Sequence, residues 1–92
     1  MSETTITLPE SLTIHHIEGQ LGDLRLAFQS DAETFNLEGS KVENIDTSGL
    51  QLLLALIKSA QAGNKTIQWT APSEQLTTSA SKLGLSEKLM LS

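Results

Sequence analysis

The heptapeptide NIDTSGL, from Asn44 to Leu50, leads without a break into the apolar segment Gln51 to Ala62. Its Asp, Thr, Ser and Gly residues are of the kinds that cap helices and shape turns. The apolar residues that follow recur at helical spacing on one continuous face: Leu50, Leu53, Leu54, Ile57 and Ala60. Leu52 and Leu56 lie off that face. We therefore predict a loop that feeds the N-terminus of an apolar helix, which closes at Gly63.

Three short segments alternate between apolar and polar residues, as strands with one buried face do. They are residues 4–8, Thr34–Glu38 and Thr66–Thr70. The side chains expected to point inward are Ile6, Leu8, Phe35, Leu37, Ile67 and Trp69. Strands covered on both faces would be continuously apolar, so we expect helices on one face of the sheet only. Because helical segments separate the strands, we also expect the strands to pair in parallel.

Helical spacing predicts two further helices. The first should begin at Ser11 or Thr13 and run to about Ser30, with an apolar face made of Ile14, Ile17, Leu21, Leu24 and Phe28. Two glycines, Gly19 and Gly22, weaken this helix by up to about 1 kcal/mol each relative to alanine. The last helix should begin at Pro72 or Ser73 and carry a thin apolar stripe of Leu76, Ala80 and Leu83 before Gly84. For the tail, residues 85–92, a short helical turn remains an open alternative.

Composition predicts a single small domain over residues 1–92. The chain has no cysteine, which excludes disulfides and thiolate metal sites. No apolar run is long enough to span a bilayer and the N-terminus has no signal-peptide core, so we expect a cytoplasmic protein without direct membrane insertion. The net charge is -5, and the six Lys and Arg residues are scattered singly. Nucleic acid is therefore not expected as a partner.

The run Asp46-Thr47-Ser48-Gly49-Leu50 resembles the Asp-Ser/Thr-Ser/Thr-Gly-Leu signature of STAS domains, the family of bacterial anti-sigma factor antagonists. It is preceded by an apolar residue and followed by a leucine-rich helix, as in that family. The later elements also come in the family's order, from the Gly63-Asn64 turn to the helix ending at Leu83-Gly84-Leu85. The resemblance covers nearly the whole chain. It implies an α/β fold, a small STAS-type sandwich with a mostly parallel sheet and helices on one face.

The same resemblance implies a non-enzymatic regulatory module that binds a protein partner through the loop and the helix after it. The residues that it assigns to partner binding are Asn44, Asp46, Thr47, Ser48, Gly49 and Leu50. Family precedent places reversible phosphorylation on the hydroxyl residue directly after the aspartate, here Thr47, with Ser48 as the second candidate. Many relatives have serine there, so Thr47 is a departure that keeps the hydroxyl and adds a methyl group.

Two kinds of partner follow from the resemblance. One is a serine/threonine kinase-type anti-sigma factor or another signalling protein, such as those of bacterial chemotaxis. The alternative is the ATPase of a phospholipid-transport ABC complex, because the run after Asp46 also resembles the small STAS subunit of those complexes. A regulator would be switched by phosphorylation, whereas a transporter subunit would stay bound without it. The resemblance implies no cofactor.

Other interpretations of the same residues remain open. Asp46, Thr47 and Ser48 are all common helix caps, and Gly49 could serve only close backbone packing. His15 and His16 point in different directions on the predicted helix, so we expect no metal site there. Ser48 lacks the Gly-x-Ser-x-Gly turn of hydrolases, and no Gly-Lys-Ser/Thr run marks a phosphate-binding loop. We therefore expect no catalytic residues.

Overall fold

Parallel strands and three helices make up the structure, a computed structural model that describes residues 2–91. The strands β1 (Glu3–Thr7), β3 (Thr34–Glu38) and β5 (Thr66–Thr70) form one sheet in the order β1-β3-β5. A second, two-stranded parallel sheet joins β2 (Ser11–Leu12) to β4 (Asn44–Ile45). The helices are α1 (Ile17–Ala27), α2 (Thr47–Ala62) and α3 (Glu74–Lys82). Met1 and Ser92, the two ends of the predicted domain, lie outside the described residues.

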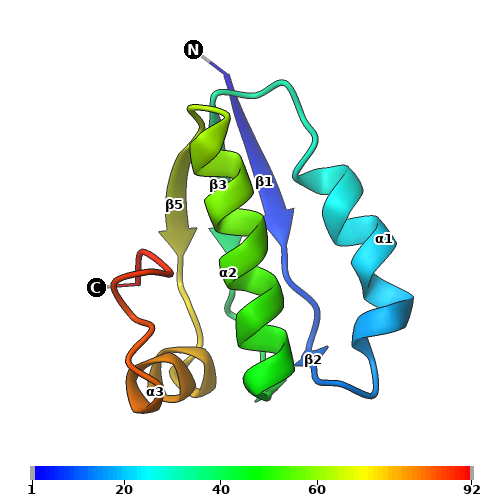
Figure 1. The fold of residues 1–92 in the computed structure, drawn as a ribbon, viewed down its shortest axis with the longest axis vertical. Coiled ribbons are helices and arrows are strands. Elements are labelled where there is room, and N and C mark those ends of the chain that lie inside the picture. Colours follow the sequence, from blue (N-terminus) through cyan, green and yellow to red (C-terminus); the bar gives the residue numbers. More distant parts are fainter. Residues whose placement is uncertain (1, 92) are drawn as a thin grey trace.

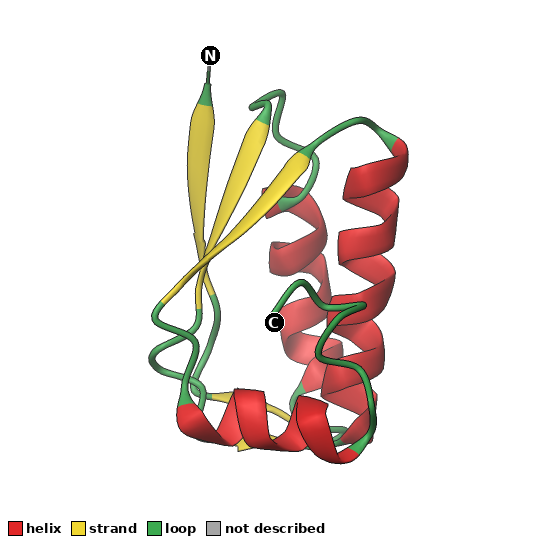
Figure 2. Cartoon of the chain, turned by 90° about the vertical axis from the view of Figure 1, so that its left-hand side faces the viewer, coloured by secondary structure: helices red, strands yellow, loops and turns green. Residues whose placement is uncertain are grey.

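The three-stranded sheet is covered on one face, as the alternating strands predict. Figures 1 and 2 show α1 and α2 on the same side of this sheet, while α3 lies across the end at which the strands finish. Inward residues of the strands, such as Ile6, Leu37 and Ile67, are buried. Their neighbours Thr5 and Gln68 are exposed on the uncovered face. The predicted fold class, a mostly parallel α/β fold with helices on one face, is therefore confirmed.

The apolar face of α2 forms much of the core. Leu53 and Ile57 are 0% exposed, and the other predicted members of this face, Leu50, Leu54 and Ala60, are also buried. Leu56, which lies off this continuous face, is buried as well, so α2 is buried over more than one face. Helix α1 packs beside α2 and covers this second flank. The helix ends as predicted at Ala62 and Gly63, although the residue that adopts the left-handed conformation is Asn64, with φ 64°.

The predicted start of the first helix is wrong. Ser11 and Leu12 form β2 instead, in register with Asn44 and Ile45. A turn follows, in which the carbonyl of Thr13 accepts hydrogen bonds from the amides of two residues, and α1 begins only at Ile17. Pairing with a distant strand thus overrides the helical spacing of these residues. The largest consequence is for Ile14, which is 64% exposed rather than part of a buried face.

The chain after β5 differs from prediction in one residue. Helix α3 begins where expected, because the Ser73 hydroxyl accepts a hydrogen bond of 3.1 Å from the amide of Leu76 and caps the helix. Leu76 and Ala80 are buried, but Leu83 follows the end of the helix and is 48% exposed. The tail supplies Leu89 to the core in its place. The indole nitrogen of Trp69 donates a hydrogen bond of 2.8 Å to the Leu89 carbonyl and holds the tail.

We predict that Gly22→Ala stabilises the protein. Gly22 lies inside α1, and a Cβ atom added there meets nothing within 4 Å. Alanine costs less backbone entropy than glycine in a helix interior, so the free energy of unfolding should rise by about 0.5–1 kcal/mol. Urea denaturation measures this change. An equal or lower midpoint for Gly22→Ala than for the wild type would contradict the prediction.

Within the described part of the chain, none of the helices has the length and apolar character required to cross a membrane.

Candidate functional site

The predicted partner-binding loop lies where several elements meet. The N-terminus of α2 contacts both β2 and β4, and β4 in turn contacts α3. Figures 1 and 2 place this junction at the end of the molecule where the three main strands finish. The six residues of the predicted site are thus held by elements from the N-terminal, central and C-terminal parts of the sequence.

Asp46 is the N-cap of α2 and uses both carboxylate oxygens. Oδ1 accepts a hydrogen bond of 3.0 Å from the amide of Gly49, and Oδ2 accepts one of 2.9 Å from the amide of Ile14. The second bond ties the turn before α1 to the start of α2. These two hydrogen bonds lower the pKa of Asp46 because they favour its charged form, and the bond from the Ile14 amide has the larger effect. Asp46 is therefore ionised at neutral pH.

Gly49 and Leu50 serve the packing of the helix. Both residues are buried. A Cβ atom on Gly49 would overlap the carbonyl oxygen of Leu12 and would lie 3.0 Å from Cγ1 of Ile45. Only glycine therefore lets α2 approach β2 this closely. A partner that docks on this end would touch neither Gly49 nor the Leu50 side chain directly.

The remaining predicted site residues present side chains at the surface. Thr47 is the first residue of α2 and is exposed, and Ser48 beside it is half-buried. Asn44 is exposed, with its amide nitrogen 3.3 Å from the hydroxyl of Ser11, to which it donates a hydrogen bond. Together with the half-buried Asp46, these three are the residues of the predicted site whose side chains reach the surface.

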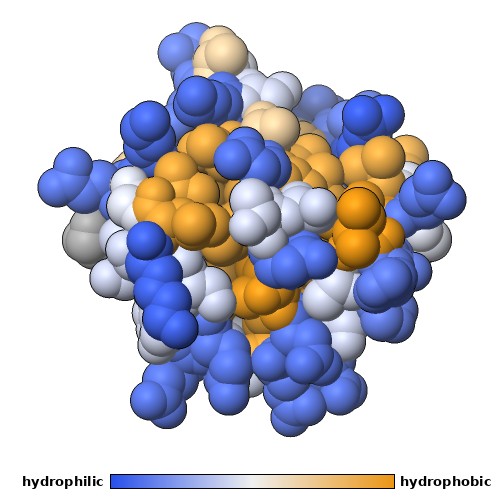
Figure 3. Space-filling model, turned by 60° about the horizontal axis from the view of Figure 1, so that its bottom comes forward, coloured by the Kyte–Doolittle hydropathy of each residue, from blue (hydrophilic) through white to orange (hydrophobic). Residues whose placement is uncertain are grey.

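Two apolar residues at this end were not predicted as part of the site. Ile14 is 64% exposed and hydrogen-bonds to Asp46 through its amide, and Leu83 after α3 is 48% exposed. Figure 3 shows this end of the molecule, with hydrophobic residues gathered in its middle and hydrophilic residues around them. The sequence predicted that both side chains are buried, because helical spacing placed them on the buried faces of helices. Exposed apolar side chains within a polar rim are typical of protein-binding surfaces.

The same end is acidic. The amides of Glu43 and Asn44 both donate to the carbonyl of Glu10, at 2.8 and 3.1 Å, which brings two glutamates together. The Glu10 side chain raises the pKa of Glu43, because it hydrogen-bonds to the protonated form and repels the charged form. A groove of 570 Å³ separates Glu43 and Asn44 from α3, where Glu74 and Lys82 line it. An anion added here would meet mostly negative neighbours.

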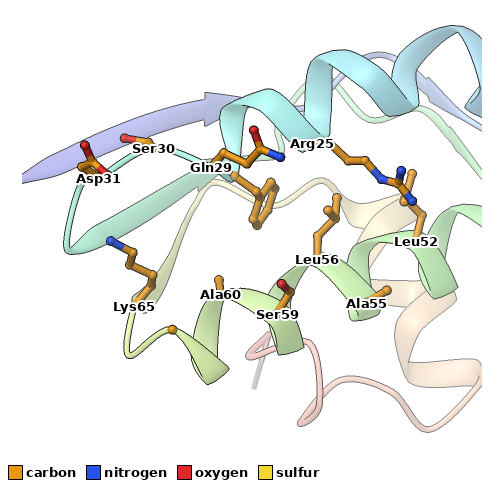
Figure 4. A pocket seen from close by; sticks show the side chains of 12 residues that line it. Arg25, Gln29, Ser30, Asp31, Leu52, Ala55, Leu56, Ser59, Ala60 and Lys65 are labelled. Carbon is orange, nitrogen blue, oxygen red and sulfur yellow. The ribbon is translucent and has the colours of Figure 1, made fainter.

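A larger groove lies elsewhere, between α1 and the side of α2 that faces it. Its volume is 640 Å³, and Figure 4 shows Leu52, Leu56 and Ser59 along its α2 wall, with Arg25 reaching across from α1. None of the six predicted site residues lines it. In residues 2–91, moreover, no three His, Cys, Asp or Glu side chains gather in a way that could hold a metal ion.

Comparison with models of protein families shows to which family the chain belongs. The family model described as "Mlab, STAS domain" matches residues 1–92. The chain belongs to the STAS domain family. The resemblance inferred from the Asp46 to Leu50 signature is therefore confirmed.

A solved structure supports the fold assignment. The chain is similar to the anti-sigma factor antagonist SpoIIAA in its unphosphorylated form, with a TM-score of 0.70 and 21% sequence identity over 94% of this chain and 76% of that one. At this identity the likeness concerns the fold. Comparison with curated protein sequences gives no match.

Proposed function

We propose that this STAS domain is a non-enzymatic regulatory module that binds a protein partner at the N-terminal end of α2. Phosphorylation of Thr47, or of Ser48, releases that partner. The contact surface consists of Asn44, Thr47 and Ser48 together with the exposed side chains of Ile14 and Leu83.

The observation that carries this proposal is that the residues of the signature have different roles in the structure. Asp46 caps the helix, and Gly49 and Leu50 pack it against the core. Thr47 neither caps the helix nor packs against the core, because it is exposed at the first position of the helix. A hydroxyl that contributes little to the fold, beside exposed apolar side chains, is suited to recognition and to modification.

A phosphate on Thr47 would leave the domain folded. The amides and the positive dipole end at a helix N-terminus favour an anion by about 0.3–1 kcal/mol in exposed settings. The phosphate also adds about 1.5 to 2 negative charges, directly after ionised Asp46 in the chain. A partner that buries this surface would have to desolvate that charge, which costs more than the local gain. Phosphorylation therefore weakens binding without unfolding.

The proposed partner is a kinase-type anti-sigma factor or another signalling protein. Because the surface is apolar at its centre and acidic around it, we infer a partner surface with an apolar pocket and a basic rim. The alternative partner, a transporter ATPase, would use the same surface but would remain bound to a chain that is never phosphorylated.

The test compares the wild type with Thr47→Glu in partner binding. Glutamate adds a negative charge at the helix start, so we expect affinity for the partner to fall at least about tenfold, equivalent to about 1.4 kcal/mol. Thr47→Val is the matched control, because it keeps the branched shape and adds no charge; it should bind within about threefold of the wild type. Affinity pull-down from a lysate of the host identifies the partner, and titration with the purified partner gives the affinities.

Mass spectrometry of the protein isolated from its host completes the test. A phosphate on Thr47 or Ser48, with a kinase-like partner lost on Thr47→Glu, supports the switch. An unmodified chain that co-purifies with an ATPase would contradict the phosphorylation switch and favour the alternative of a transporter subunit. Equal binding of Thr47→Glu and Thr47→Val would show that charge at this position does not control the partner.

A further inference from the structure

The outer edge of β1 is open. Within residues 2–91, β1 lies at one end of the strand order and pairs only with β3. The opposite end of the sheet, β5, differs because the tail packs against it, where Trp69 hydrogen-bonds to the carbonyl of Leu89. An open edge presents a row of backbone donors and acceptors that another extended chain can pair with.

The hydrogen bonds to β3 identify the free backbone groups. The Leu8 amide donates to the carbonyl of Glu38, and the Ser2 carbonyl accepts from the amide of Thr34. Backbone groups alternate in direction along a strand, so the even-numbered residues of β1 face β3. The amides and carbonyls of Glu3, Thr5 and Thr7 therefore point toward the open edge.

A groove lies directly beside these groups. It has a volume of 380 Å³ and separates β1 from α1, with Ile6 and Leu8 on the strand side and Leu24 and Ala27 on the helix side. Gln20 also lines this groove, and its Oε1 atom is buried without a hydrogen-bond partner. A buried acceptor of this kind is unfavourable unless a donor reaches it. Within the described residues, no N–H or O–H donor reaches this oxygen.

We propose that one extended peptide segment of a partner protein adds to β1 in this groove as a fourth strand. Figure 1 shows α1 lying to the side of β1, past the edge of the sheet, so a strand added there would lie under α1. Its backbone pairs with Thr5 and Thr7, and an amide from it approaches the Gln20 oxygen. Strand addition of this type takes its affinity from main-chain hydrogen bonds and its specificity from alternate side chains.

A second copy of this chain fits the edge less well. Two copies joined through β1 by a two-fold axis would form antiparallel strands and keep all their helices on one face. The α1 of each copy would then lie over the sheet of the other, on the face that α2 covers. A single extended segment brings no helix and avoids this conflict. Its inward side chains should be apolar, to fill the space between Ile6 and Leu24, and its outward ones polar.

Selection from a phage-displayed library of eight-residue peptides, with the purified wild type immobilised, supplies the probe. We expect enriched peptides that alternate apolar and polar residues. Thr5→Pro should weaken the binding of these peptides at least tenfold, because proline removes an outward amide and is tolerated on edge strands. Thr5→Val keeps the amide and should bind within about twofold. Thr47→Glu, which alters the other surface, should also leave the affinity within about twofold.

Amide hydrogen exchange of the wild type, followed by NMR, gives a test that needs no variant. At saturating peptide, exchange at Glu3, Thr5 and Thr7 should slow at least tenfold, whereas exchange at Thr4 and Ile6 should stay unchanged. Protection at other sites only, absence of any enriched peptide, or peptides that bind a folded Thr5→Pro as tightly as the wild type would each overturn the proposal.

Discussion

Replacing Gly49 by alanine is expected to lower the free energy of unfolding by about 3 kcal/mol or more. The added Cβ would overlap the backbone oxygen of Leu12, which is fixed in β2 and cannot rotate away as a side chain would. Either α2 must move off the small sheet or the sheet must distort, and overpacking of this kind costs about 1–3 kcal/mol even when side chains can give way. Domains of this size are stable by only about 5–15 kcal/mol, so the variant should lose much of its stability.

Urea denaturation followed by the fluorescence of Trp69, the one tryptophan of the chain, measures the effect. Gly63→Ala is the matched control at the other end of α2. Gly63 has a φ of -88°, and the nearest atom to its added Cβ lies at an ordinary 3.5 Å. Its free energy of unfolding should change by less than about 1 kcal/mol. If both substitutions proved equally mild, α2 would not depend on close approach at Gly49.

Asp46→Ala is expected to cost about 2–3 kcal/mol. The substitution removes the helix cap at Gly49 and the bond to the amide of Ile14, leaving two backbone donors without their acceptor. Loss of a cap typically costs about 0.5–2 kcal/mol, and a hydrogen bond to a charged group adds about 1.5–3 kcal/mol, reduced here because the site is partly solvated. Thermal and urea denaturation at neutral pH should both report the loss. Asp46→Asn, which keeps one acceptor oxygen, should lie between alanine and the wild type.

The contribution of Asp46 should also depend on pH. Its pKa in the folded protein is lowered, mainly by the amide of Ile14 and then by that of Gly49. A lowered folded-state pKa gives stability that is complete above the unfolded-state pKa, about 3.9, and is lost as the pH falls through the folded value. The difference in unfolding free energy between wild type and Asp46→Ala should therefore be constant near neutral pH and shrink below about pH 4. A difference that stayed constant into acid would show that the carboxylate charge is not responsible.

These two substitutions separate the structural part of the signature from the functional part. Asp46→Ala and Gly49→Ala should weaken partner binding only through loss of folded protein. Thr47→Glu should weaken it in a protein that unfolds at nearly the wild-type urea concentration. Measuring stability and binding on the same preparations therefore tells a damaged fold from a disrupted contact surface.

The differences between prediction and structure have a common cause. Ile14 and Leu83 both fit a helical repeat with buried neighbours, yet both lie just outside a helix and are exposed. Residues before Ile17 pair with a strand more than thirty positions away, as the register of Ser11 with Asn44 shows. The spacing of apolar residues within a short segment gives no information about such long-range pairing. The burial of Leu56, off the main apolar face of α2, likewise depends on where α1 packs.

The amino-acid sequence by itself determined the fold class, the parallel strands covered on one face, the apolar helix after Asp46 and the STAS signature at its start. These features rest on periodicity and cap chemistry, which are local properties of the chain. Only the tertiary structure decided that Asp46 bridges to Ile14, that Gly49 is needed against Leu12, and that the edge of β1 lies open beside α1. Each of these depends on the close approach of segments far apart in sequence, because hydrogen bonding and steric exclusion act over a few ångströms in space.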